Sequence, residues 1–174
     1  MKTLRTGLLF ILILVAAILI SGSSYHPSPI INYGEMWFHN DSIFYTNVIT
    51  QNTPTTVACF DSTTNGQLMS GFTYTTSSLT AKVAGKYLAR WTTSFGSSTS
   101  NNKHHFWLAV SGVEEFNTES HCKPVNSTDV ITCTGSGILT LAINNVVTLV
   151  VMDETAGETF TVFSANVNLQ RIDN

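Results

Sequence analysis

Charged side chains are scarce in this sequence, and no block of basic residues occurs anywhere along it. Lys and Arg number 8 and Asp and Glu number 11 in a chain of 174 residues, which gives a formal net charge of −3. A surface that binds nucleic acid needs a stripe of Lys and Arg facing the phosphate backbone. The sequence therefore predicts that nucleic acid is not a partner.

The spacings that structural zinc sites require are also missing. The sequence contains no Cys-x-x-Cys pair and no His-x-x-x-His pair. His104 and His105 are adjacent, so on a strand their side chains would point to opposite faces and would not share a metal ion. The neighbours His121 and Cys122 have the same geometry. We therefore expect no zinc site.

A hydrolase constellation is absent as well. A nucleophile elbow needs Gly-x-Ser-x-Gly, whereas Gly135-Ser136-Gly137 lacks that spacing and lies in a segment with strand character. Most acidic residues that could act as a catalytic pair fall at expected turns, where acids are usually only solvated: Glu114, Glu115, Asp153, Glu154 and Glu158. We predict that the protein is not an enzyme, and a hydrolase is the weakest of the functional alternatives.

Calcium is the one cofactor for which the sequence offers ligands. Asp153 and Glu154 share a loop, and with Asp129 or Glu158 they would supply oxygen ligands. These acids form no recognised ligand motif. We therefore predict no cofactor and keep calcium as the alternative.

Cysteine is rare, and the odd count of three leaves at least one thiol unpaired within the chain. The segment between Cys122 and Cys133 contains Pro124 and Asn126, which allow the chain to turn back on itself. We predict a disulfide between Cys122 and Cys133, because disulfides persist outside the cytoplasm. Cys59 lies in an apolar segment and is expected to be a buried free thiol.

The N-terminal segment is the only long apolar run. Lys2 and Arg5 precede an uncharged stretch from Gly7 to Ile20. A cleaved signal peptide has about 7–15 apolar residues, and a membrane-spanning helix has about 17–25, so residues 1–22 fit either a signal peptide or a signal anchor. In both cases the basic end stays inside, and the chain from Tyr25 onwards lies outside the cytoplasm. We expect a hydrophobic helix here and a domain that is either membrane-anchored or secreted.

The remainder of the chain shows no run with helical period. Residues 23–32 contain His26-Pro27-Ser28-Pro29 and read as a Ser/Pro spacer before a single domain at residues 33–174. Short alternating segments bounded by turn residues are typical of a sandwich or barrel, and they predict about eight to ten antiparallel strands. The expected strands are residues 33–38, 57–60, 72–74, 79–83, 86–95, 105–110, 113–120, 134–141, 146–152 and 159–171.

Three segments in the second half resemble a known family. They are Ala84-Gly85-Lys86-Tyr87-Leu88-Ala89-Arg90-Trp91, Gly135-Ser136-Gly137-Ile138-Leu139-Thr140-Leu141 and Phe163-Ser164-Ala165-Asn166-Val167. These segments resemble strands of the globular head of complement component one, subcomponent q, whose jelly roll is shared with the tumour necrosis factor superfamily. The Ser, Thr and Asn content is similar to that of viral and bacteriophage versions. The resemblance implies an all-β jelly-roll sandwich that assembles as a homotrimer and binds partners.

Alternation predicts which side chains would form the trimer contact. Tyr87 and Trp91 are expected in the core, which turns Leu88 and Arg90 outward. If the alternate residues Phe163, Ala165, Val167 and Leu169 also face the core, the side chains of Phe160 and Val162 turn outward too. Apolar residues on an outer face indicate contact with another surface. The predicted interface residues are Leu88, Arg90, Phe160 and Val162.

The function predicted from these features is a non-catalytic trimeric surface module for binding or adhesion. Its partner would be a glycan, a cell-surface protein or a capsid protein, and its location a membrane or a virion. The alternative is a purely structural virion or filament subunit with no ligand. The sequons Asn40-Asp41-Ser42 and Asn126-Ser127-Thr128 would carry glycans at Asn40 and Asn126 in a host that glycosylates.

Overall fold

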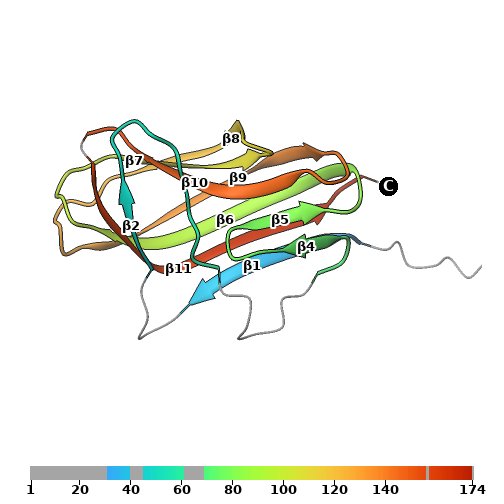
Figure 1. Ribbon diagram of the computed structural model, residues 1–174, viewed down its shortest axis with the longest axis horizontal. Coiled ribbons are helices and arrows are strands. Elements are labelled where there is room, and N and C mark those ends of the chain that lie inside the picture. The colour runs from blue at the N-terminus through green and yellow to red at the C-terminus, as the bar shows by residue number, and fades with distance from the viewer. Residues whose placement is uncertain (1–30, 40–44, 61–68, 156, 174) are drawn as a thin grey trace, which may run out of the picture. The chain divides into compact units, whose positions relative to one another are not determined.

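The computed structural model folds into two antiparallel β-sheets (Figure 1). The described residues are 31–39, 45–60, 69–155 and 157–173. The expected N-terminal helix at residues 1–22, most of the expected spacer and the sequon at Asn40 lie outside these ranges. Within them, no helix has the length and apolar character needed to cross a bilayer.

The first sheet has the strand order β1-β11-β6-β9, with β2 paired to one half of β11. Its strands are β1 (Tyr33–His39), β2 (Tyr45–Ile49), β6 (Gly85–Ser97), β9 (Val130–Leu141) and β11 (Glu158–Arg171). The second sheet has the order β4-β5-β10-β7-β8, with β3 paired to β10. Its strands are β3 (Thr55–Thr56), β4 (Phe72–Tyr74), β5 (Ser78–Ala81), β7 (His104–Val110), β8 (Val113–Cys122) and β10 (Val146–Asp153).

The all-β class predicted from the sequence is confirmed, although the described residues hold eleven strands and not the predicted eight to ten. The short strands β2 and β3 were not predicted. Residues 57–60 were predicted as a strand but form none, even though Val57, Cys59 and Phe60 are buried. A buried apolar segment without regular strand pairing has the same residue pattern as a short strand.

The core lies between the sheets and is rich in aromatic rings. Phe95 contacts Phe106 and Phe160 with ring centroids 5.0 and 5.1 Å apart, and Trp91 lies 5.7 Å from Phe106. Such pairs add about 0.5–1.5 kcal/mol each beyond the burial of their area. These rings come from β6, β7 and β11, so they hold the long central strands of one sheet against the other.

A bulge in β11 overturns part of the predicted outer face. Phe160 and Val162 are both fully buried, and their orientation was predicted wrongly. The pairing of β11 with β6 shifts between Val162 and Ser164, which leaves Phe163 as the extra residue. One extra residue reverses the alternation that follows it, so the side chains facing the core are Phe160 and Val162 before the bulge and Ala165 after it.

The described unit begins and ends at the same end of the sandwich. Tyr33 pairs with Gln170, and the Arg171 N–H donates to the Asn32 carbonyl oxygen over 2.8 Å. The other end carries the connections that follow β6 and precede β9, because Gly96 of β6 pairs with Val130 of β9 there (Figure 1).

Candidate functional site

The outer face of the first sheet, meaning its side that points away from the core, is a candidate contact surface. The strand registers align Tyr33, Gln170, Leu88 and Ile138 in one row across β1, β11, β6 and β9. Ile138 is 53% exposed, and Leu88 is half-buried. This row places apolar side chains from three strands at one edge of the face.

The centre of the outer face is polar. Glu35, Asn168, Arg90 and Ser136 form the next row. The Asn166 side-chain amide donates to the Glu35 carboxylate over 2.7 Å. Hydrogen-bonding groups beside an apolar row can bind another protein surface.

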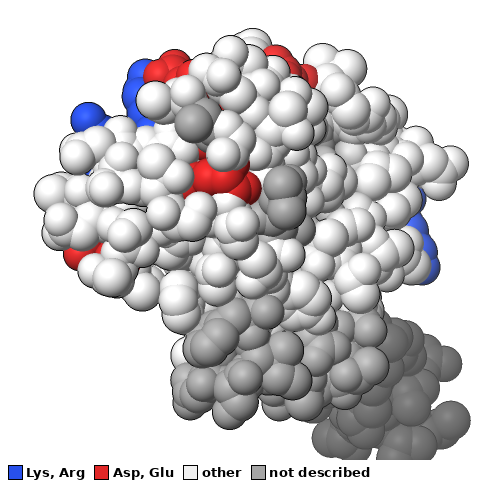
Figure 2. All heavy atoms as spheres, turned by 60° about the vertical axis from the view of Figure 1, so that its left-hand side comes forward, with Lys and Arg blue, Asp and Glu red and all other residues white. Residues whose placement is uncertain are grey.

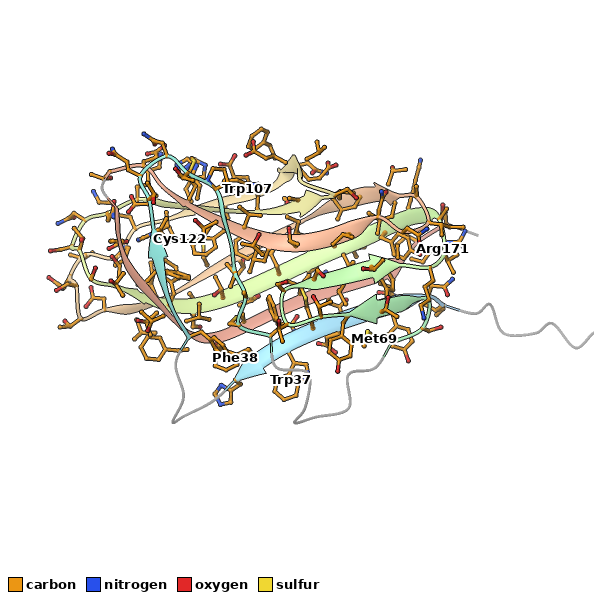
Figure 3. All side chains as sticks on the ribbon, viewed as in Figure 1. Trp37, Phe38, Met69, Trp107, Cys122 and Arg171 are labelled. Carbon is orange, nitrogen blue, oxygen red and sulfur yellow. A yellow bond between two sulfur atoms is a disulfide. The ribbon has the colours of Figure 1, made fainter. Side chains whose placement is uncertain are left out.

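Trp37 adds an aromatic side chain to this face. Because Trp37 and Phe38 are adjacent on β1, only one of their rings was expected in the core. Phe38 is buried and Trp37 is half-buried on the outer side (Figure 3). Trp37 borders a shallow hollow of about 320 Å³ that also includes Thr92 and Asn166.

The predicted interface residues are therefore divided between the two sides of the sheet. Leu88 and Arg90 lie on the outer face as predicted, whereas Phe160 and Val162 lie in the core. The alternation of β1 and β9 could have identified Trp37 and Ile138, but the pairing that brings them onto one face with Leu88 is not visible in the sequence. Asn126 lies in an exposed turn and donates to Asp129, and its glycosylation stays a prediction.

Charged side chains are sparse on the surface. Figure 2 shows small separated acidic and basic patches on a largely uncharged face, with no basic stripe on the face shown. This distribution agrees with the small net charge of −3.

The open edge between the two sheets is closed by a cross-link and by a bulge in β8. Cys122 of β8 and Cys133 of β9 form a disulfide with their Cα atoms 5.9 Å apart. Residues 116–119 of β8 lie opposite Trp107 alone, because Ser120 pairs with Phe106 and Glu115 with Leu108. The free thiol of Cys59 is buried elsewhere in the core, and burial raises its pKa to about 12.

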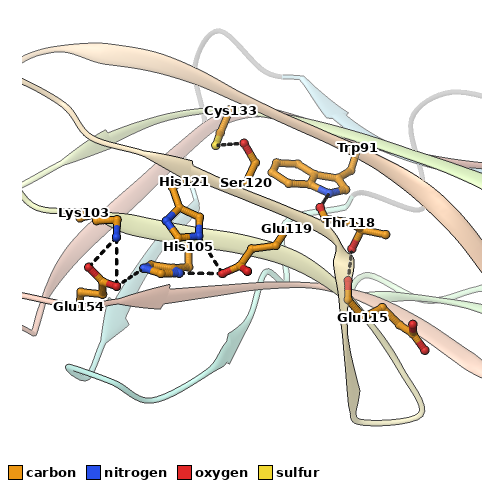
Figure 4. Close-up of polar contacts among 10 residues, drawn as sticks. All are labelled: Trp91, Lys103, His105, Glu115, Thr118, Glu119, Ser120, His121, Cys133 and Glu154. Carbon is orange, nitrogen blue, oxygen red and sulfur yellow. Dashed lines mark hydrogen bonds and ion pairs between the residues drawn. The ribbon is translucent and has the colours of Figure 1, made fainter.

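Thr118 in this bulge connects both sheets. Its carbonyl oxygen accepts from Trp91 Nε1 over 2.9 Å (Figure 4). Its hydroxyl oxygen accepts from the Leu108 N–H over 2.8 Å. A Cβ atom on Gly135 would lie 2.4 Å from that same carbonyl oxygen. Only glycine therefore allows β8 to approach β9 this closely.

Removal of the disulfide should lower the free energy of unfolding by about 3 kcal/mol, the loop-entropy estimate for a closed loop of roughly 12 residues. The variant Cys122→Ser/Cys133→Ser, unfolded in urea and followed by circular dichroism, measures the loss. The wild-type protein should lose a similar amount in a thiol reductant, whereas the double variant should not respond to it. Equal stability of the two proteins without reductant would contradict the estimate.

A buried polar group lies at the end of the sandwich opposite Asn32 and Arg171. His104 Nε2 lies 2.9 Å from Glu158 Oε1, and both side chains are buried. Glu158 also accepts from the Thr99 N–H over 2.9 Å, and Asp153 accepts from Asn102 Nδ2 and from the Thr155 N–H. Burial lowers the pKa of His104, and Glu158 and Asp153 oppose that effect.

The structure corrects the expectation that these acids are solvated, because Asp153 and Glu158 are buried at strand ends. The four acids considered as calcium ligands are not brought together. Asp153 and Glu158 lie near His104, whereas Glu154 pairs with Lys103, and Asp129 accepts from Asn126. Calcium binding stays an untested alternative.

A second group lies on the opposite side of β7. His105 Nδ1 is 2.7 Å from Glu119 Oε1, and His121 Nε2 is 3.0 Å from the same oxygen (Figure 4). His105 Nε2 lies 2.5 Å from Glu154 Oε1, and the Lys103 ammonium is 3.0 Å from the other oxygen of Glu154. The hydrogen bond from Lys103 holds the pKa of Glu154 below its ordinary value. The sequence did not reveal this group, because its members come from two strands, β7 and β8, and from the two loops that hold Lys103 and Glu154.

Comparison by sequence finds no match to any protein-family model or curated protein. Comparison by structure defines the class of fold, which is the jelly roll of tumour necrosis factor and complement head domains. The resemblance drawn from the sequence is thereby confirmed at the level of the fold.

Three solved structures illustrate the similarity of fold. Eiger TNF from S. frugiperda has a TM-score of 0.56 and 16% identity, covering 82% of this chain and 94% of that one. The globular domain of zebrafish complement 1qA protein has a TM-score of 0.52 and 17% identity, covering 82% and 98%. PRD1 vertex protein P5 has a TM-score of 0.53 and 14% identity, covering 82% and 97%. At these identities the likeness is one of fold alone.

Proposed function

We propose that this protein is a non-catalytic surface module that assembles as a homotrimer through the outer face of the β1-β11-β6-β9 sheet. The observation that carries the proposal is the row of Tyr33, Leu88 and Ile138 beside a polar centre on that face. An outer sheet face exposed only to water should be polar. The shared jelly roll supports the same arrangement, since the resemblance to tumour necrosis factor and complement heads implies trimers.

Burial of the apolar row would contribute to the free energy of association. Full burial of a side chain of the size of Leu or Ile contributes roughly 1.5–3 kcal/mol. A threefold axis repeats each contact in every subunit, so Leu88 and Ile138 act several times in one trimer. Arg90 and Glu35 nearby would provide charge-assisted hydrogen bonds that fix the register between subunits.

The module would act by recognition rather than by chemistry. Residues 1–22 would hold it at a membrane or direct its export, and the domain would lie outside the cytoplasm. Three copies on one axis would raise the affinity for a repeated partner such as a glycan, a cell-surface protein or a capsid protein.

A structural subunit of a virion or filament is the second candidate, and the match to PRD1 vertex protein P5 favours it. The two candidates separate by experiment. Binding to a glycan array or to intact cells supports the recognition module, whereas recovery in purified particles without any such binding supports the structural subunit.

Residues 31–174 should sediment as a trimer in analytical ultracentrifugation. Ile138→Asp should shift the protein to a monomer with an unchanged circular dichroism spectrum, because it places a charge in the contact and leaves the core intact. Val113→Asp is the matched control, since Val113 is an exposed apolar residue on the other sheet. A monodisperse wild-type monomer at high micromolar concentration would overturn the proposal.

A further inference from the structure

We propose that His105, Glu119 and His121 form a binding site for a single Zn²⁺ ion. The site is built from neighbouring strands. His105 of β7 pairs directly with His121 of β8, and the two imidazole rings have centroids 3.8 Å apart. Glu119 is the last residue of the β8 bulge, and its Oε1 atom lies 2.7 Å from His105 Nδ1 and 3.0 Å from His121 Nε2.

The spacing of the donor atoms fits one small ion. One donor atom from each residue lies within 4.8 Å of the other two. Four-coordinate zinc has bonds of about 2.0–2.2 Å to nitrogen and oxygen, which places neighbouring ligand atoms roughly 3.3 Å apart. The distances of 2.7 and 3.0 Å from the Glu119 oxygen to the two imidazole nitrogens need only a small expansion to reach that value.

His105 is oriented by a second carboxylate. Its Nε2 atom faces Glu154, and Lys103 holds Glu154 from the other side. Imidazole ligands of zinc usually donate their second ring N–H to a carboxylate, which directs the lone pair of the other nitrogen towards the metal. His105 is only 7% exposed, so the surrounding structure fixes its ring before any ion arrives.

The remaining ligands leave the site open to solvent. The side chains of His121 and Glu119 are 43% and 23% exposed, so an ion can enter without unfolding the sandwich. Three protein ligands leave a fourth position for water or for a group from a partner. Two imidazoles and one carboxylate suit zinc, whereas calcium prefers oxygen ligands alone.

The buried group of His104, Asp153 and Glu158 also has three donors within 4.8 Å, but it fits a resident ion less well. Backbone N–H groups and neutral side chains already donate to its two carboxylates. Glu119 in the open site instead contacts the imidazoles of His105 and His121. We therefore place the zinc site at His105, Glu119 and His121, independently of the trimer.

The test is a Zn²⁺ titration of the full chain, purified in detergent without a polyhistidine tag and treated with a chelator. Isothermal calorimetry should show one ion per chain, and Co²⁺ should give the visible absorption of a four-coordinate site. His121→Ala should weaken the affinity by at least about 100-fold. Glu154→Gln should weaken it about 10–100-fold through the orientation of His105.

His39→Ala is the matched control, because His39 is an exposed histidine of β1 on the other sheet. The affinity of this variant for Zn²⁺ should equal that of the wild type. Unchanged circular dichroism of each variant shows that the fold is retained. The proposal fails if Zn²⁺ does not bind, if His121→Ala binds it as tightly as the wild type, or if His39→Ala loses it equally. In each of these cases the three side chains form ion pairs only.

Discussion

Val162→Asp should unfold the domain rather than weaken an assembly. Val162 is fully buried between the sheets, where it pairs with Phe95 of β6. The substitution removes a packed apolar side chain worth roughly 1.5–3 kcal/mol and leaves a carboxylate in the core without a partner, which costs several kcal/mol more. A total loss above about 5 kcal/mol is comparable with the whole stability of a domain of this size.

Thr161→Asp is the matched control, because Thr161 is the preceding residue of β11 and lies on the outer side of the sheet. Circular dichroism and urea unfolding of both variants measure the difference. Thr161→Asp should fold with a near-normal midpoint, and Val162→Asp should lack the cooperative transition. The reverse result would mean that β11 runs without the bulge at Phe163.

Gly135→Ala should be the second most damaging change, although it adds a single methyl group. The new Cβ atom would lie 2.4 Å from the Thr118 carbonyl oxygen and 2.5 Å from Trp91 Nε1. Neither atom lies at the end of a flexible side chain, so β8 must move away from β9. Overpacking costs about 1–3 kcal/mol, and loss of the buried hydrogen bond from Trp91 costs about 1–3 kcal/mol more.

The free energy of unfolding in urea, followed by tryptophan fluorescence, measures the effect of Gly135→Ala. The matched control is Ser136→Ala, because Ser136 is the next residue of β9 and is exposed on the outer face. The control should lie within about 0.5 kcal/mol of the wild type, as surface substitutions usually do. Similar stabilities for the two variants would show that the β8 bulge can shift at little cost.

The sequence predicted the fold where alternation continues without interruption. In β6 the pattern of Tyr87, Ala89, Trp91 and Phe95 identified the core side correctly, because every residue of that strand keeps period two. The same reasoning failed in β11, where one inserted residue at Phe163 reverses the phase. A bulge of this kind leaves no mark in composition, since the residues around it are ordinary strand formers.

The zinc site lay beyond sequence reasoning for a related cause. A regular hairpin from the turn at Ser111 and Gly112 would place His105 opposite Thr118, counting from the pair of Leu108 with Glu115. The bulge at residues 116–119 shifts β8 along β7 and places His121 there instead. The same shift sets Cys122 opposite His104, at the edge where it meets Cys133.

The shared position of Asn32 and Arg171 at one end of the sandwich determines what the module can present. Asn32 and Arg171 are hydrogen-bonded at one end of the sandwich, and β6 runs from there to the other end over 13 residues. At about 3.3 Å per residue, that strand carries its far connections roughly 40 Å away from any attachment made at residue 31. A fluorescent protein or an affinity handle joined close to Arg171 would lie beside such an attachment and leave the distal loops unobstructed. Those loops are accordingly the place to insert a foreign epitope for display.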